Sequence, residues 1–454
     1  MLNILTKKES SVFYKTMLGI ALPIALQSLI GTTLNMVDTV MIGSLGEAAI
    51  AAVGIANRVF FFYALCVFGT YSGMSIFTSQ YWGVKDTLNI RRIMGIMISI
   101  GSILGIIFTL LAALIPNHIL SIFINDKEVI ALGSSYLRII CASYIITAIS
   151  FAFNYASRSV HKTKLPMVVS AVALLTNTFL NYTLIYGNFG FSAMGVKGAA
   201  IATVSSRILE LFLLIFFIYK NKDHPLAGKF SEMFSYSREM VQKVIKTAFP
   251  VFINESTWAL GTTVYYIAYG YLGKEAVAAV QITYTISDFF QALFMGLGNA
   301  TAVMIGNEIG KRNKDLAYRY GKQFLTLSSI LAVIISFAIF LLRPVIINFF
   351  NIGPTTQAML FQTLFVVAIY LLPKMFTYVM IVGVLRSGGD TKFCMIIDLL
   401  GVWLIGVPLA FIGVKVLHYP VHLIIALVFF EEALKCIITL PRFKSKKWIR
   451  RLID

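Results

Sequence analysis

The sequence predicts an all-α polytopic membrane protein with twelve transmembrane helices in two homologous six-helix bundles. The chain has 454 residues, of which 58% are hydrophobic and only 13% charged, and its mean hydropathy is +0.82. A typical soluble domain is about 25% charged. The chain contains many apolar runs of about 20 residues or more, the length that crosses a bilayer as a helix. The alternating pattern of a β-barrel is absent, so helices must satisfy the backbone hydrogen bonds.

The second half of the chain repeats the first. Pro23 begins PIALQSLIGTTLNMVDTVMIGSLGEAAIAAVGI, and 227 residues later (250 − 23) Pro250 begins PVFINESTWALGTTVYYIAYGYLGKEAVAAVQI. Further along, the offset becomes 228, as for Arg158 and Arg386. An apolar chain with duplicated halves is typical of transporters, whose halves rock against each other around a site between them.

Each half contains six predicted spans, which glycine and proline residues punctuate. The predicted spans are 15–42, 48–80, 93–115, 130–156, 165–187 and 193–219 in the first half, and 244–271, 275–308, 319–342, 355–385, 391–414 and 420–441 in the second.

These spans divide the chain into four predicted regions. They are an N-terminal six-helix lobe (1–219), a cytoplasmic interlobe linker (220–246), a C-terminal six-helix lobe (247–441) and a basic cytoplasmic tail (442–454). We expect the linker to include an amphipathic helix at the cytoplasmic face and the tail to lie on anionic lipid headgroups. The N-terminus is short and polar, without a cleavable signal pattern.

The net charge of +18 is distributed as in a membrane protein and not as in a nucleic-acid-binding protein. With the N-terminus in the cytoplasm, 28 of the 38 Lys and Arg residues fall in cytoplasmic segments and only six in external ones. This asymmetry follows the positive-inside rule and puts both termini in the cytoplasm. Because each half has an even number of spans, the two halves have parallel topology.

Intramembrane polar residues of the first half indicate an ion site, since charges inside a bilayer are costly. Asp38 lies near the outer end of the first span, with no basic residue one turn away, and Asn177 and Asn181 lie four apart on one face of the fifth span. Carboxylate and amide oxygens suit a small cation or a proton. The alternative is an interfacial aspartate, with the asparagines as interhelical hydrogen bonds. Pro23 lets the first span bend or gives it a static kink.

The second half carries a different charged set, formed by Glu255, Lys374 and Asp398 on spans seven, ten and eleven. We expect them to compensate one another inside the lobe and to leave one negative charge that accepts a proton or a cationic substrate. The alternative is a structural salt-bridge cluster without a role in transport.

Other patterns favour structural roles. The Arg207–Glu210 pair on span six and the group of Glu431, Glu432 and Lys435 on span twelve fit helical ion pairs. No GxxxxGK, HExxH or GxSxG motif is present, and the four cysteines lack metal-ligand spacing. We therefore expect neither an ATP-driven pump nor an enzyme, and no cofactor or structural metal.

The motifs of this chain resemble those of the multidrug and toxic compound extrusion (MATE) transporters, in their bacterial NorM-like branch. The resemblance is carried by NMVDTVMIGSLGEAAIAAVGI, NTFLNYTLIYGNFGFSAMGVKGAAIAT and VLRSGGDTKF, in this order, and it covers essentially the whole chain. It implies the MOP-type fold, a V-shaped pair of six-helix bundles around a central cavity. It also implies secondary antiport, in which cationic amphipathic organic compounds leave the cell in exchange for Na⁺ or H⁺.

The resemblance assigns roles in the first lobe residue by residue. Asp38 matches the cation-coupling aspartate of the first span, Asn177 and Asn181 match its fifth-span partners, and Thr203 matches a sixth-span hydroxyl. These residues would hold the coupling ion, which is a proton or a Na⁺ at Asp38, Asn177 and Asn181. Pro23 matches the kink position and is the expected hinge.

The second lobe departs from the family pattern. Glu255 matches the seventh-span carboxylate, but Met375 stands where the NorM pattern has a tenth-span aspartate. A second-lobe cation site of the NorM type is therefore not expected, and Asp398 is the residue that would restore the lost negative charge.

The expected function is thus a secondary active antiporter of a bacterial cytoplasmic membrane. Its expected partners are small organic cations and the lipid bilayer, with no nucleic acid, and it is expected to be a monomer. The alternative is a lipid-linked oligosaccharide flippase of the same superfamily, which would need a cationic cavity. The intramembrane charges of this chain are mostly acidic, and this favours the antiporter.

Overall fold

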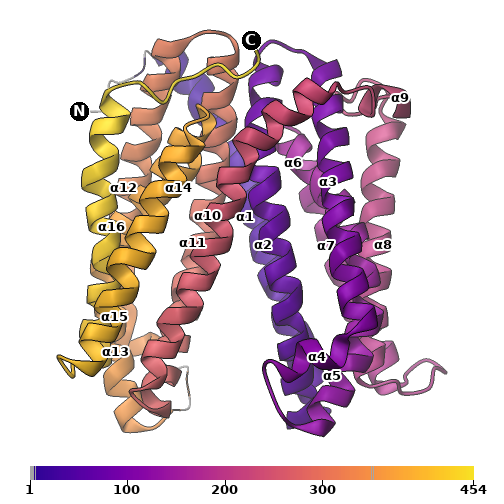
Figure 1. The fold of residues 1–454 in the computed structure, drawn as a ribbon, viewed down its shortest axis with the longest axis vertical. Coiled ribbons are helices and arrows are strands. Elements are labelled where there is room, and N and C mark those ends of the chain that lie inside the picture. The colour runs from indigo at the N-terminus through magenta and orange to yellow at the C-terminus, as the bar shows by residue number, and fades with distance from the viewer. Residues whose placement is uncertain (1–4, 6, 349, 351) are drawn as a thin grey trace. The chain divides into compact units, whose positions relative to one another are not determined.

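The computed structural model describes every residue except 1–4, 6, 349 and 351, and all regular structure in the described residues is helical (Figure 1). The first half contains α1 (Lys7–Gly43), α2 (Glu47–Gly83), α3 (Thr87–Leu114), α4 (Pro116–Ser121), α5 (Lys127–Ile140), α6 (Ala142–Ser159), α7 (Lys164–Tyr186), α8 (Val196–Lys220) and α9 (Phe230–Met233). The second half contains α10 (Arg238–Gly270), α11 (Lys274–Gly310), α12 (Lys314–Asn348), α13 (Pro354–Tyr378), the π-helix η1 (Val379–Leu385), α14 (Thr391–Leu400), the π-helix η2 (Gly401–Gly406), α15 (Val407–Lys415) and α16 (Val421–Lys444).

Each of the twelve predicted spans coincides with one long helix or with helices that follow each other directly. Within the described residues, nine segments are long and apolar enough to cross a membrane, or ten when the bent pair α5–α6 counts as one span. The other two predicted spans are α10 and α16. α10 is less apolar, since it carries Asn254 and Glu255, whereas α16 is apolar but carries two glutamates and a lysine. Part of the charged interior of the second half thus lies on these two helices, and the rest lies on α11, α13 and α14.

The predicted span 130–156 is not one straight helix. It breaks into α5 and α6, which meet at Cys141 with a bend of 46°. The Thr109 hydroxyl of α3 donates to the Cys141 carbonyl at 2.9 Å, and the Tyr63 hydroxyl of α2 donates to the Tyr144 carbonyl at 2.6 Å. Side chains of neighbouring helices thus hold carbonyl groups at the break, which is how a bilayer helix tolerates one.

The tenth and eleventh predicted spans each contain a π-helical segment. η1 continues α13 up to Arg386, and η2 separates α14 from α15. π-Helical turns are rare and occur mostly inside α-helices, frequently at functional sites. Nothing in the hydrophobic pattern of these spans distinguishes them from regular α-helix.

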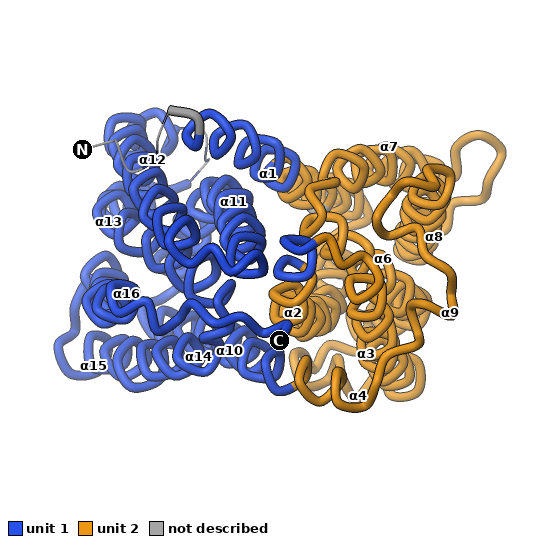
Figure 2. The backbone as a smooth tube through the Cα atoms, turned by 90° about the horizontal axis from the view of Figure 1, so that it is seen from above, with its two compact units in different colours: residues 1–25, 79–84, 246–454 blue, residues 26–78, 85–245 orange. Residues whose placement is uncertain are grey.

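The chain forms two compact units (Figure 2). Unit 1 contains residues 1–25, 79–84 and 246–454, and unit 2 contains residues 26–78 and 85–245. This division differs from the lobes expected from the sequence, because the start of α1 and the end of α2 belong with the second half. The reason for α1 is its packing: the Phe13 ring is fully buried, with its centroid 4.7 Å from that of Phe324 on α12. Arg319 of α12 also forms an ion pair with Glu9 at 2.8 Å.

The ends of α2 and α11 meet in a reciprocal contact within unit 1. A Cβ atom at Gly83 would lie 2.1 Å from the Asn307 carbonyl oxygen, and one at Gly310 would lie 2.0 Å from the Gln80 carbonyl oxygen. Both pairs are related by the repeat offset of 227. Only glycine allows two helix backbones to approach this closely, so the repeat uses the same residue on both sides.

The basic tail packs on the protein and not solely on lipid, contrary to the expectation from its charge. Trp448 is fully buried, and its carbonyl lies against Gly388. The Leu452 amide donates to the Gln80 side-chain oxygen at 2.6 Å, and Arg451 Nε donates to the Gly310 carbonyl at 2.9 Å. The tail therefore covers the α2–α11 contact.

The linker has little helix of its own. It contains the single-turn helix α9, and its last residues already belong to α10. Arg91 of α3 holds α9 through an ion pair with Glu232 at 2.8 Å. The expected amphipathic helix of the linker is therefore limited to α9 and the first turns of α10.

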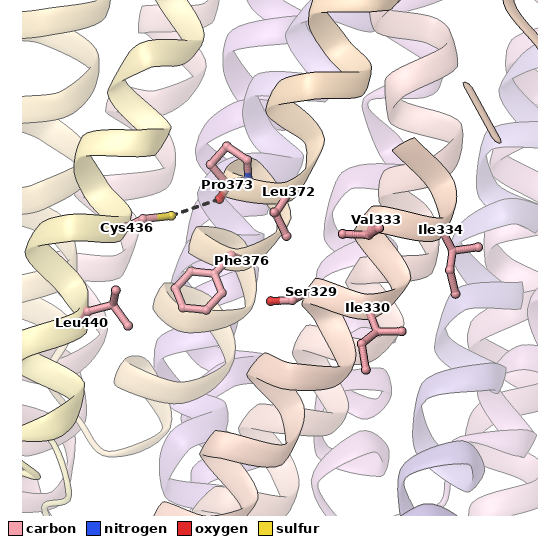
Figure 3. A pocket seen from close by; sticks show the side chains of 9 residues that line it. All are labelled: Ser329, Ile330, Val333, Ile334, Leu372, Pro373, Phe376, Cys436 and Leu440. Carbon is pink, nitrogen blue, oxygen red and sulfur yellow. Dashed lines mark hydrogen bonds between the residues drawn. The ribbon is translucent and has the colours of Figure 1, made fainter. Parts of the chain in front are cut away.

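An apolar groove of about 560 Å³ lies between α12, α13 and α16 in unit 1 (Figure 3). Pro373 interrupts the hydrogen bonding of α13 at the groove. The Cys436 thiol of α16 donates to the Pro373 carbonyl at 3.6 Å, as the dashed line in Figure 3 marks. Leu372, Pro373 and Phe376 are the residues of α13 that line the groove.

Replacing Gly310 by alanine should destabilise the fold, because the new Cβ would overlap the Gln80 carbonyl. Overpacking of this kind costs about 1–3 kcal/mol, so the melting temperature in detergent should fall clearly. Gly31→Ala is the matched control, since nothing lies within 4 Å of a Cβ at that position. An equal melting temperature for Gly310→Ala and Gly31→Ala would contradict the close contact.

Candidate functional site

The structure brings the four predicted first-lobe residues together inside unit 2. Asp38 lies on α1, Asn177 and Asn181 on α7 and Thr203 on α8. Asn181 Nδ2 donates to Asp38 Oδ1 at 2.5 Å and to Asn177 Oδ1 at 3.0 Å. Asn177 Nδ2 in turn donates to Thr203 Oγ1 at 3.3 Å. One chain of hydrogen bonds thus links a carboxylate, two amides and a hydroxyl from three helices.

The hydrogen-bond chain leaves an oxygen without a partner. Both asparagine side chains are fully buried, and Asn181 Oδ1 has no hydrogen bond among the described residues. A buried amide oxygen without a partner is costly, so its place beside Asp38 suits a ligand that brings positive charge. The available donors are carboxylate, amide and hydroxyl oxygens, the set that a hard cation or a proton takes. Among the described residues, no cluster of three or more His, Cys, Asp or Glu side chains would hold a transition metal.

Pro23, the predicted hinge, is buried inside α1. It lies two residues before the point at which α1 passes from unit 1 into unit 2. Its repeat partner Pro250 lies four residues after the point at which α10 passes back into unit 1. Both prolines therefore lie where a helix joins the two units.

A second polar chain crosses unit 2 from Gln27, which lies nearer the start of α1 than Asp38 does. Gln27 Nε2 donates to Ser170 Oγ at 3.1 Å, and Ser170 Oγ donates to Glu210 Oε1 at 3.0 Å. Glu210 also pairs with Arg207 at 2.7 Å, and Arg158 Nη2 donates to Gln27 Oε1 at 3.1 Å. The sequence pattern predicted the Arg207–Glu210 pair but missed the three residues that connect it to α1.

In the second lobe, the expected mutual pairing of Glu255, Lys374 and Asp398 is not what the structure shows. Glu255 pairs with Arg386 at 2.7 Å, and only 3% of the Arg386 side chain is exposed. The predicted spans 355–385 and 391–414 leave Arg386 in the segment between them, but in the structure it follows η1 directly and is buried.

Asp398 pairs with α16 and α10. Its Oδ1 lies 3.2 Å from Lys435 Nζ, and its Oδ2 accepts a hydrogen bond from Asn254 Nδ2 at 2.9 Å. Lys374 donates instead to Ser287 Oγ at 3.2 Å, and its ammonium lies 5.7 Å from the centroid of the Phe429 ring. The partners were missed because Lys435 was interpreted as part of an ion pair within its own helix.

The correspondence between the two halves predicts the partners of Glu255 and Asp398. Gln27 on α1 and Ser170 on α7 form a bridge 143 residues apart, and Asn254 on α10 and Asp398 on α14 form a bridge 144 residues apart. Arg158 and Arg386 are repeat partners as well, and each reaches the first helix of its half. Comparison of the two halves position by position therefore identifies the interior network.

The comparisons with known proteins agree with this architecture. The sequence matches the MatE family over residues 23–183 and 250–412, one segment in each half. A probable multidrug resistance protein NorM from Thermotoga maritima is 26% identical over 99% of this chain and 96% of that protein. The probable multidrug resistance protein YoeA from Bacillus subtilis is 23% identical over 89% of this chain and 88% of that protein.

Solved structures show the same fold. An outward-facing multidrug resistance MATE family transporter of the MOP superfamily superimposes with a TM-score of 0.86 at 18% identity, covering 95% of this chain and 96% of the other. A MOP superfamily transporter from Pyrococcus furiosus gives a TM-score of 0.86 at 17% identity, covering 95% of each chain.

Fold, repeat and buried polar groups together define a multi-pass membrane transporter with two homologous six-helix halves. The chain belongs to the MATE family, in its NorM-like bacterial branch. It is therefore a transporter and not an enzyme.

The geometry of the second lobe makes a prediction about energetic coupling. Lys435→Met should destabilise the protein by about 3–5 kcal/mol, because it leaves buried carboxylates without their cation. Combining it with Asp398→Asn should cost less than the sum of the single changes. Asp398→Asn combined with Lys374→Met should be additive within about 0.5 kcal/mol, the value for residues that do not interact. Thermal unfolding of the purified single and double variants measures the coupling energy of each pair. A larger coupling energy for Asp398 with Lys374 than for Asp398 with Lys435 would contradict the pairing of Asp398 with Lys435.

Proposed function

We propose that this protein is a secondary active antiporter that exports cationic amphipathic organic compounds from a bacterial cell in exchange for Na⁺ or H⁺. The observation that carries the proposal is the surroundings of Asp38: a partly buried carboxylate whose hydrogen-bond partner is an amide and not a base. The names of relatives as multidrug resistance proteins support the substrate class. The cytoplasmic membrane, with both termini inside, is the location that the charge asymmetry supports.

In this proposal the Asn181 amide senses the state of Asp38. An ionised Asp38 accepts from Asn181 Nδ2, whereas a protonated Asp38 presents an O–H donor to the amide and a Na⁺-bound Asp38 presents a cation. Rotation of the amide by half a turn would then bring the unpartnered Asn181 Oδ1 toward the ion. Because Asn181 Nδ2 also donates to Asn177, which in turn donates to Thr203, this rotation changes the contacts of α7 with both α1 and α8.

The coupling would bias the carrier between its outward-open and inward-open states. A ligand shifts such an equilibrium only through its different affinity for the two states. Ion binding at Asp38 supplies this difference in affinity if the hydrogen bonds from Asp38 through Asn181 to Asn177 are intact in only one of the two states. One elementary charge crossing about 100 mV contributes roughly 2.3 kcal/mol to this shift. Pro23 is the residue at which α1 would bend, since it removes a hydrogen bond within the helix.

Asp38→Asn should reduce gradient-driven efflux to the level of vesicles without the protein, because the amide cannot be protonated or bind Na⁺ as a carboxylate does. Glu47→Gln is the matched control, since it makes the same chemical change at an exposed residue of α2. The measurement is efflux of a fluorescent cationic dye from everted vesicles, under a Na⁺ gradient and, separately, a H⁺ gradient. Efflux at the wild-type rate in Asp38→Asn would refute the coupling role.

Expression in a drug-sensitive host should raise tolerance to ethidium-like and quaternary ammonium compounds before it affects anionic compounds. Flat cations gain from aromatic stacking and from buried carboxylates, whereas anions meet uncompensated negative charge. Growth inhibition across both classes of compound measures this preference. Resistance to anionic compounds alone, or binding of lipid pyrophosphates without binding of cations, would replace the antiporter by a lipid-linked oligosaccharide flippase.

A further inference from the structure

The interior of unit 1 contains more acids than bases. Among the described residues, one connected group includes five carboxylates and three cations, with a formal charge of −2 (3 − 5). The carboxylates belong to Glu255, Asp288, Asp398, Glu431 and Glu432, and the cations to Arg386, Lys374 and Lys435. A net charge of this size inside a membrane lobe calls for further positive charge.

The excess is concentrated around Lys435 of α16. Its Nζ lies 3.2 Å from Asp398 Oδ1, 3.4 Å from Glu432 Oε1 and 3.8 Å from Glu431 Oε2. The Lys435 side chain is 3% exposed, and that of Glu431 is 6% exposed. Glu255 and Arg386 compensate each other, as do Asp288 and Lys374 by charge. Three carboxylates are therefore left to share one ammonium.

Two oxygens in this group have no hydrogen bond. Glu431 Oε2 is fully enclosed and without a hydrogen-bond partner among the described residues, as is Asn254 Oδ1 on α10. The other oxygen of Glu431 accepts from the Tyr265 hydroxyl at 3.3 Å. Buried polar atoms normally find a partner, so these two oxygens indicate that the group accepts something the protein itself does not supply.

Glycines and π-helical backbone lie next to this charged group. A Cβ at Gly401 would lie 2.5 Å from Lys435 Cε, and one at Gly406 would lie 2.0 Å from the Tyr265 hydroxyl. These glycines are the first and last residues of η2. The other π-helix, η1, separates Thr377, which donates to Glu432, from Arg386. Both π-helices of the described residues therefore border the group, and such segments are frequent at functional sites.

We propose that Glu431 and Glu432 share one exchangeable proton, so that the second lobe contains a proton-binding site besides the Asp38 group. A hydronium ion transfers its proton to one carboxylate oxygen: an O–H bond of the hydronium breaks as the new O–H bond forms, a neutral water departs, and the charge of the group changes from −2 to −1. The Lys435 ammonium already occupies the centre of the oxygens, where a bound metal cation would lie. The additional positive charge must therefore reside on a carboxyl group.

The groups that face the glutamate pair come from every neighbouring element. They are Tyr265 on α10, Lys374 on α13, Asp398 on α14, and Lys435 and Cys436 on α16. Asp288 on α11 faces Lys374, and Arg386, with its partner Glu255, faces Asp398. Because interacting carboxyl groups titrate as a unit, the proton belongs to the pair and not to one glutamate. A role of this proton in transport rests on the proposed antiport, whereas the presence of the proton on the glutamate pair does not.

Infrared spectroscopy of the purified protein tests for this proton without any substrate. The difference spectrum between neutral and alkaline pH should contain the C=O band of a protonated carboxyl group, and Glu431→Gln should remove that band. Glu432→Gln should weaken it at neutral pH, since the group then carries one negative charge fewer. Glu431→Asp keeps a carboxyl group and should keep the band. Melting temperatures confirm that each variant is folded.

Glu210→Gln is the matched control, because Glu210 is a buried glutamate balanced by one arginine, Arg207. This change and Asp38→Asn should both leave the Glu431 band in place. A band that persists in both Glu431→Gln and Glu432→Gln would overturn the proposal. Failure of Asp38→Asn to stop efflux would refute the antiport proposal and would leave the infrared result unaffected.

The transport role has its own measurement in proteoliposomes, the number of protons taken up for each dye molecule exported. Glu431→Gln should lower that number by one relative to the wild-type protein and to Glu210→Gln. An unchanged proton count would show that the second-lobe proton does not take part in the cycle.

Discussion

The bridge between the first and fifth spans of each half is the interaction on which the interior of the protein depends. Gln27 reaches Ser170 in the first half, and Asn254 reaches Asp398 in the second. Gln27 also accepts from Arg158 of α6, and Asp398 also pairs with Lys435 of α16, so each bridge ties two helices together and connects them to a third. In the first half, the same pair of helices carries Asp38 and Asn181. The bridge therefore determines the distance at which the candidate ion site is held.

The two halves place their charges differently on this common frame. In the first half, the series of polar contacts through the bridge ends at the buried residue Glu210, and Arg207 lies one turn earlier on the same helix. In the second half, the corresponding series ends at Lys435, and Glu432 lies one turn earlier. At the repeat offset of 228, Lys435 corresponds to Arg207, so both halves keep a cation at this position and differ in where their acids lie. The first half holds the Asp38 carboxylate beside an amide, and the second half surrounds the Lys435 ammonium with carboxylates.

The sequence was sufficient to predict the elements with a strong local signal. Each of the twelve predicted spans coincides with one long helix or with consecutive helices, and the spacing of Asn177 and Asn181 put both on one helix face, where the structure joins them to Asp38. Features that depend on tertiary contacts were not predictable in the same way. The bend at Cys141 depends on the Thr109 hydroxyl of another helix. Arg386 follows a π-helix whose sequence is as apolar as any α-helix, so its burial beside Glu255 was not foreseen.

Unit 1 is formed by segments from both ends of the chain, and this affects the order in which the chain folds during synthesis. Unit 2 is formed by residues 26–78 and 85–245, so all of it has left the ribosome before the second half is made. Residues 1–25 are synthesised first, yet their partners on α12 come some three hundred residues later. The interval is longer still for Gln80, because its hydrogen-bond partner Leu452 is among the last residues to be synthesised. Domains generally fold as they emerge, so the earliest residues of this protein are among the last to reach their final environment.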